Sequence, residues 1–83
     1  MNREYLEAFH PEVMTMDGFD DCILGICERI NQESIVAYDL QKVLAKLQKQ
    51  GMTEDEAEEW YSYNMLGAWV GPETPCFVDR REM

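Results

Sequence analysis

Two helix boundaries lie close together in the middle of the chain and constrain its fold more than any other feature. Asp39 stands at an N-cap position, directly before a segment whose apolar residues recur at helical spacing. Gly51 follows that segment at the position where helices commonly end on a glycine. Thr53 then opens a capping box, with a glutamate three residues later. The pattern predicts helices over about 39–50 and 54–66, joined as an αα-hairpin.

The segment before the hairpin carries another helical pattern. Apolar residues recur there at i, i+3, i+4, i+7 and i+11, at Phe19, Cys22, Ile23, Ile26 and Ile30. This spacing is the apolar stripe of an amphipathic helix, so we expect an N-terminal helix from about residue 19 to residue 30. A strand over 22–27 is the alternative, although it would place Gly25 and Cys27 on one face with little to pack.

Two short runs have the composition and length of strands. Residues 34–38 are mostly β-branched or aromatic and are bounded by polar residues. Residues 76–78 form a three-residue apolar run that could pair with them. The sequence therefore predicts a helix-dominated α+β fold with a minimal two-stranded sheet, in a single compact domain over residues 19–83. Residues 1–18 show no clear period and are expected to form a weakly ordered N-terminal arm.

The charge balance limits the partners that this chain can have. Its 83 residues include 7 Lys plus Arg and 17 Asp plus Glu, for a formal net charge of −10. Direct binding to nucleic acid or to anionic membranes is disfavoured, because both require a basic face. A basic surface on another protein is favoured, since complementary charge raises association rates, although acidity also serves solubility alone. A chain this short buries a modest core, so a homo-oligomer would gain stability.

Cysteine usage and the N-terminal sequence bear on location. Three cysteines, Cys22, Cys27 and Cys76, cannot all pair within one chain. No apolar stretch follows the first residues, so we expect no signal peptide, and no run approaches the roughly 20 residues that span a bilayer. These features favour a reducing cytoplasm.

Residues that could carry chemistry are sparse, and we expect no catalytic residue, cofactor or metal. His10 is the single histidine, and the cysteines lack the CxxC spacing typical of zinc sites. A calcium-loop spacing runs from Asp17 to Glu28, but its sixth position, which needs a glycine, is Cys22. No phosphate-binding glycine motif is present. The sequence favours a binding protein over an enzyme.

The most distinctive stretch places both tryptophans and two tyrosines within ten residues. A small domain must bury some of these rings, and Trp and Tyr are common anchors of protein interfaces. We expect Trp60, Tyr63, Asn64 and Trp69 to bind a partner, with Tyr63 and Trp69 exposed. If Asn64 points inward, it needs a hydrogen-bond partner and could lock the glycine-containing turn that follows.

Acidic residues crowd the start of the same helix, at Glu54, Asp55, Glu56, Glu58 and Glu59. One interpretation is structural, because the helix dipole favours acids in the first turn. The other is a phosphate-mimicking surface, in which Glu54, Asp55, Glu58 and Glu59 contact a partner that binds nucleic acid. Both interpretations stay open.

The preceding helix carries a lysine stripe opposite its apolar face, at Lys42, Lys46 and Lys49. Such a stripe is typical of a solvated helix face. We expect these lysines to pair locally with neighbouring acids.

Several of these segments resemble a group of small uncharacterised proteins common in bacteriophage genomes. The most specific part is a GAWVG-x-x-TP-x-F motif from Gly67 to Phe77. Further matching segments over residues 17–78 are Tyr38-Asp39, Gly51-Met52-Thr53, Glu56-Ala57 and Tyr63-Asn64. The resemblance implies a virus-encoded accessory protein acting in the bacterial cytoplasm, with a role in host takeover or in countering defence. It brings no catalytic residues.

We therefore hypothesise a non-enzymatic phage accessory protein that binds and modulates or inhibits a host or defence protein. The alternative is a protein that binds or sequesters a small, nucleotide-like ligand. In that case Asn64, Tyr38 and the turn over 60–71 would line its pocket. A phosphorylated ligand would require basic residues such as Lys42 and Lys46 to converge on it, because the net charge opposes it.

Overall fold

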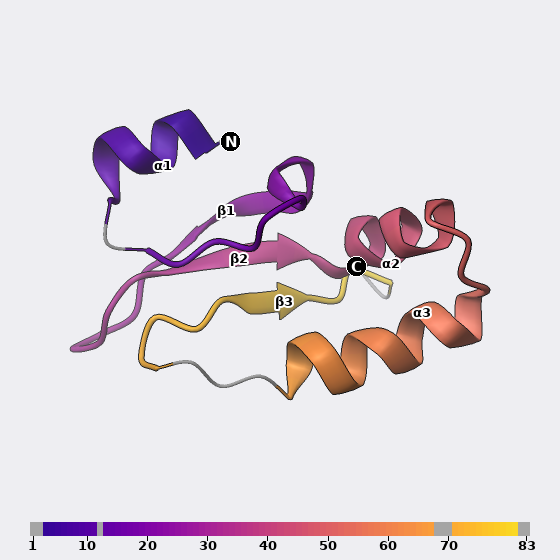
Figure 1. Ribbon diagram of the computed structural model, residues 1–83. Helices are drawn as coiled ribbons and strands as arrows, with labels where there is room; N and C mark the ends of the chain where they lie inside the picture. The colour runs from indigo at the N-terminus through magenta and orange to yellow at the C-terminus, as the bar shows by residue number, and fades with distance from the viewer. Residues whose placement is uncertain (1–2, 12, 68–70, 82–83) are drawn as a thin grey trace.

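The computed structural model describes residues 3–11, 13–67 and 71–81, which form a small α+β fold (Figure 1). In chain order the elements are α1 (Arg3–Phe9), the 3-10 turn η1 (Asp20–Cys22), β1 (Ile23–Cys27), β2 (Ile35–Asp39), α2 (Leu40–Lys49), α3 (Glu54–Tyr61), the π-helical turn η2 (Ser62–Leu66) and β3 (Cys76–Val78). The predicted α+β class and the αα-hairpin are confirmed. Among the described residues, no helix has the length and apolar character needed to cross a membrane.

The predicted helix over residues 19–30 is wrong, because the chain makes only the turn η1 there and then extends as β1. Short apolar runs fit both the helical and the strand period, and the partner strand decides between them. Ile23 and Ile26 favour a strand as β-branched residues, while Gly25 would cost a helix about 1 kcal/mol relative to alanine. The strand alternative is therefore the correct one.

The sheet has three strands in the order β1-β2-β3, one more than the sequence predicts. β1 runs antiparallel to β2, with an irregularity between Ile23 and Gly25, whereas β3 runs parallel to β2. The predicted pairing of the two short runs is thus confirmed. Gly25 and Cys27 do share a face, opposite Ala37 and Ile35, and none of these four belongs to the main core cluster. Ile35 and Ala37 are nevertheless buried on this face.

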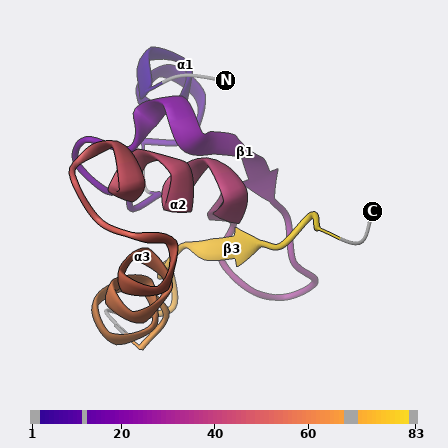
Figure 2. The same cartoon turned by 90° about the vertical axis from the view of Figure 1, so that its right-hand side faces the viewer.

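The hairpin begins and ends where its capping residues predict. The Asp39 side chain accepts a hydrogen bond from the Lys42 backbone N–H, and Thr53 and Glu56 form the reciprocal capping box. Gly51 adopts a φ of +107°, a conformation that L side chains rarely adopt, and so ends α2 in the expected way. α2 and α3 lie on the same side of the sheet (Figure 2).

The core fills the space between the sheet and the hairpin. Val36 and Tyr38 from β2 and Val43 from α2 are completely buried. The Tyr61 ring packs edge-on against Phe77 at a centroid distance of 5.0 Å and so joins α3 to β3. These contacts pack α2 and α3 against β2 and β3.

The N-terminal segment contacts the same core. Leu6 of α1 is only 2% exposed and belongs to the core cluster. The Met16 backbone N–H donates to the Tyr38 hydroxyl at 2.7 Å, which satisfies that polar group inside the core. Tyr38 is therefore a central structural residue with no exposed surface.

Asp39 ties the C-terminal segment to the hairpin. Its carboxylate is 4% exposed, caps α2 through Oδ1 and pairs through Oδ2 with the Arg80 guanidinium at 3.0 Å. A buried carboxylate requires such partners. One side chain thus serves as helix cap and as anchor for the segment after β3.

Candidate functional site

The outer face of α3 and η2 carries a shallow groove of about 330 Å³, which we call the aromatic groove. Its lining residues are Met52, Glu56, Glu59, Trp60, Tyr63 and Asn64. Three of the four residues predicted to anchor a partner therefore lie together. The fourth, Trp69, lies outside the described residues.

Large apolar side chains of α3 and η2 remain exposed although the domain is small. Tyr63 is 78% exposed, Leu66 is 63% exposed and Trp60 is 38% exposed. The prediction that Tyr63 is exposed is confirmed. Tyr61 and Met65 point the other way and belong to the core. α3 and η2 thus divide their large side chains between the core and the surface.

The π-helical turn shapes one end of the aromatic groove. A π-helix shifts backbone pairing from i+4 to i+5, and such turns are frequent at functional sites. The Asn64 side chain is exposed and donates to the Trp60 backbone carbonyl at 3.0 Å. Asn64 therefore bonds backward to α3, whereas the sequence allowed for an inward residue that locks the following turn. Gly67 closes that turn through its own backbone N–H, which donates to the Ser62 carbonyl.

The acids of α3 fall into different environments. Glu59 lines the aromatic groove, and no ion pair holds it among the described residues. Glu58 instead pairs with the Arg81 guanidinium at 2.9 Å. Glu54 and Asp55 are exposed in the first turn, outside the groove lining. Of the four predicted partner-binding acids, the structure brings only Glu59 together with the aromatic residues.

Arg81 organises the acids beside the C-terminal segment. It also pairs with Asp79 at 2.7 Å, and this contact holds the pKa of the Asp79 carboxyl well below its usual range. The hydrogen bonds that Arg81 donates, first to Asp79 and then to Glu58, raise the pKa of Arg81 further above its ordinary value. Glu58 and Asp79 are therefore local partners of an arginine, which reduces their availability to a partner protein.

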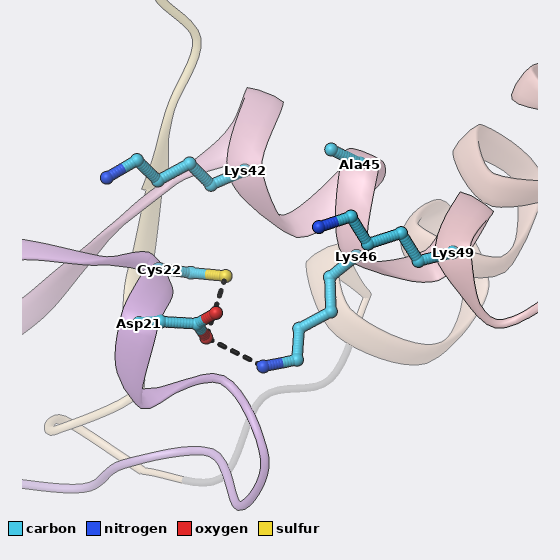
Figure 3. A pocket seen from close by; sticks show the side chains of 6 residues that line it. All are labelled: Asp21, Cys22, Lys42, Ala45, Lys46 and Lys49. Atoms are coloured by element: carbon cyan, nitrogen blue, oxygen red, sulfur yellow. Dashed lines mark hydrogen bonds and ion pairs between the residues drawn. The ribbon is translucent and has the colours of Figure 1, made fainter.

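A second hollow, of about 580 Å³, lies between η1 and α2, and we call it the lysine hollow (Figure 3). Its lining residues are Asp21, Cys22, Lys42, Ala45, Lys46 and Lys49, which include every lysine of the chain. Lys46 reaches across from α2 and pairs with Asp21 at 2.7 Å. The predicted pairing with neighbouring acids is wrong in its location, because the partner comes from a turn 25 residues away.

The lysine hollow contains an ion pair and a thiol whose pKa values are shifted by their surroundings. The hydrogen bond between Lys46 and Asp21 lowers the pKa of the carboxyl and raises that of the ammonium. Burial, with the Asp21 charge as a smaller cause, raises the pKa of the Cys22 thiol to about 11. Cys22 is therefore a protonated thiol at neutral pH, which is unsuited to nucleophilic attack.

Two predictions about ligands can be compared with the geometry. In the described ranges, no three His, Cys, Asp or Glu side chains gather closely enough to hold a metal ion. The pocket predicted to include Tyr38 does not form in that way, because the Tyr38 ring is fully buried in the core. Asn64 lines a separate apolar hollow of about 250 Å³ with Pro75 and Phe77, on the other side of η2.

Sequence reasoning missed two features of these surfaces. Glu56, Glu59, Trp60 and Tyr63 fall at i, i+3, i+4 and i+7, so their common helix face could have been found from spacing alone. The lysine hollow could not, because its second wall is the turn η1, in a segment expected to be helical.

The comparisons with known proteins add no relative. No family model matches the chain, and neither a curated protein nor a solved structure matches it.

Proposed function

We propose that this protein is a non-enzymatic binding module that recognises a basic segment of another protein through the aromatic groove. The observation that carries the proposal is the joint exposure of Trp60 and Tyr63 beside the carboxylate of Glu59, which forms no ion pair with any of the described residues. Aromatic anchors flanked by charge are typical of protein-binding surfaces. An Arg or Lys side chain of the partner would lie over a ring face while its charge meets the carboxylate.

The charge of the whole chain supports the same class of partner. A net charge of −10 creates a negative field that attracts basic surfaces and repels acidic ones. Such steering speeds association and weakens as salt screens it, with a Debye length of about 8 Å at physiological ionic strength. We therefore expect association with the partner to slow as the ionic strength rises.

The resemblance to bacteriophage proteins supports a role for this binding. A virus-encoded module of this kind would modulate or inhibit a host or defence protein in the bacterial cytoplasm. A target with a basic surface, such as one that itself binds nucleic acid, fits the acidic and aromatic character of the groove.

The test compares capture of partners from bacterial lysate by matched variants. Tyr63→Ala removes the most exposed ring of the groove, while Tyr5→Ala removes a 43% exposed ring on α1. We expect a protein that is captured at near-stoichiometric amount by the unchanged chain and by Tyr5→Ala, and that is lost with Tyr63→Ala and at high salt.

The opposite pattern would contradict the proposal. A captured protein that Tyr63→Ala retains in full at every salt concentration does not use the aromatic groove. Circular dichroism of each variant keeps this result separate from a loss of folding, because Tyr63 makes no contribution to the buried core.

A further inference from the structure

The distribution of cations on this acidic protein is uneven. Arg29 is held within the loop before β2 by the Glu33 and Pro72 carbonyls. Arg80 and Arg81 pair with carboxylates near the C-terminal segment. The three lysines, in contrast, all line one hollow. Among the described side chains, positive charge is therefore concentrated in the lysine hollow.

The three lysines differ in their counter-charges. Lys46 pairs with Asp21, whereas Lys42 and Lys49 are exposed and form no ion pair within the described part of the chain. Lys42 and Lys46 are four residues apart on α2, and Lys46 and Lys49 are three apart, so like charges face each other along the helix. Such pairs destabilise a helix. A bound anion would relieve this repulsion.

We propose that the lysine hollow is a binding site for a small anion that carries two or more linked phosphate groups. The hollow of about 580 Å³ is in the range of small-ligand sites. Lys42 and Lys49 lie seven residues apart, which corresponds to about 10 Å along the helix axis. An extended anion with charges at both ends matches this separation better than a single phosphate does.

The type of cation indicates phosphate as the ligand chemistry. Arginine forms planar, bidentate pairs that suit carboxylates, whereas a lysine ammonium acts as a point charge and commonly binds phosphate. All the cationic side chains that line the hollow are lysines. At physiological ionic strength, acids more than a Debye length away are largely screened, so the three lysines and the nearby acids Asp20 and Asp21 determine whether a compact anion binds.

Asp21 competes with such a ligand for Lys46. Its carboxylate occupies one donor of an ammonium group that has three. Removing this negative charge should therefore tighten anion binding. A purely structural role of the hollow predicts no such gain.

The experiment titrates the protein with inorganic pyrophosphate at constant ionic strength and follows backbone amide shifts by NMR. We expect saturable shifts at Cys22 and Ala45, which line the hollow, and none at Tyr63 in the aromatic groove. Lys42→Ala and Lys49→Ala should each weaken binding about tenfold, as expected for the loss of one charge-assisted contact. Asp21→Asn should tighten it severalfold.

Arg81→Ala is the matched control, because it removes the same charge outside the hollow. The proposal is overturned if Arg81→Ala weakens binding as much as Lys42→Ala, or if only non-saturable shifts appear. Equal binding of the tricarboxylate citrate would overturn phosphate as the ligand class. Because the site and the readout differ from those of the aromatic groove, failure here leaves the proposed protein-binding function untouched, and the reverse also holds.

Discussion

The two helices of the hairpin use their side chains differently. α2 buries four large aliphatic residues, Leu40, Val43, Leu44 and Leu47. α3 buries only Ala57 and Tyr61 and leaves Trp60 at the surface, with Tyr63 following in η2. Their outer faces also differ in charge, since α2 carries lysines and α3 carries mainly acids. Within one motif, α2 therefore contributes most of the buried aliphatic side chains, whereas α3 and η2 leave aromatic side chains exposed to a partner.

The largest effect expected from this division is on stability. Leu47 is 1% exposed, so Leu47→Ala should lower the free energy of unfolding by about 3 kcal/mol through lost burial and a cavity. Tyr63→Ala should change it by no more than about 0.5 kcal/mol, as is usual for surface substitutions. Urea denaturation of both variants measures the difference. Similar losses would show that η2 contributes to the core as strongly as α2.

The next largest loss of stability is expected from a substitution at the start of α2. Asp39→Ala removes the N-cap and leaves Arg80 without its buried partner, so we expect a loss of about 1 to 2 kcal/mol. Thermal unfolding monitored by circular dichroism checks this. Arg80→Ala serves as the control, since it removes the ion pair and keeps the cap. A loss for Arg80→Ala equal to that for Asp39→Ala would contradict the dominant role of the cap.

The wall of the lysine hollow gives a smaller, pH-dependent effect. The Cys22 pKa is raised to about 11 in the folded protein, whereas a cysteine in the unfolded chain titrates near about 8.5. The folded state thus keeps a proton that the unfolded state releases, so its stability contribution is complete below about pH 8.5 and is lost as the pH rises toward about 11.

Cys22→Ala should therefore make the free energy of unfolding fall less steeply between pH 8 and pH 10. The change in slope should correspond to roughly the one proton that the Cys22 thiol no longer contributes. Burial also raises the pKa values of Cys76 and Tyr61, so part of the decline should remain. Urea denaturation across this pH range gives both slopes. Parallel slopes for the variant and the unchanged chain would show that Cys22 does not contribute to the pH dependence of stability.

The hairpin was predictable because its signals are local. Asp39, Gly51 and the capping box around Thr53 each act on the nearest turn, and all three take the predicted positions. β1 was not predictable in this way, because its choice between helix and strand depends on pairing with β2, which lies beyond its own sequence. The run over 76–78 was recognised because its β-branched partner had already been identified.

The candidate surfaces were also predictable only where their signals are local in the sequence. Tyr63 could be assigned to the surface from the surplus of rings on one short helix, whereas the exposure of Trp60 was not predicted. The environment of each acid could not be assigned, because Arg81 approaches Glu58 from a distant segment, whereas Glu59 forms no ion pair within the described part of the chain. The lysine hollow likewise depends on a turn that only the folded chain brings to α2.

A comparison of two neighbouring glutamates tests the central claim most directly. Glu59 lines the aromatic groove, and Glu58 is paired with Arg81, so Glu59→Gln and Glu58→Gln remove the same charge from the same helix in different environments. The measurement is the association rate with the captured partner at low and high salt. The account predicts that Glu59→Gln slows association about twofold to threefold at low salt and that Glu58→Gln leaves it nearly unchanged. Equal rates for the two variants would contradict binding through the aromatic groove.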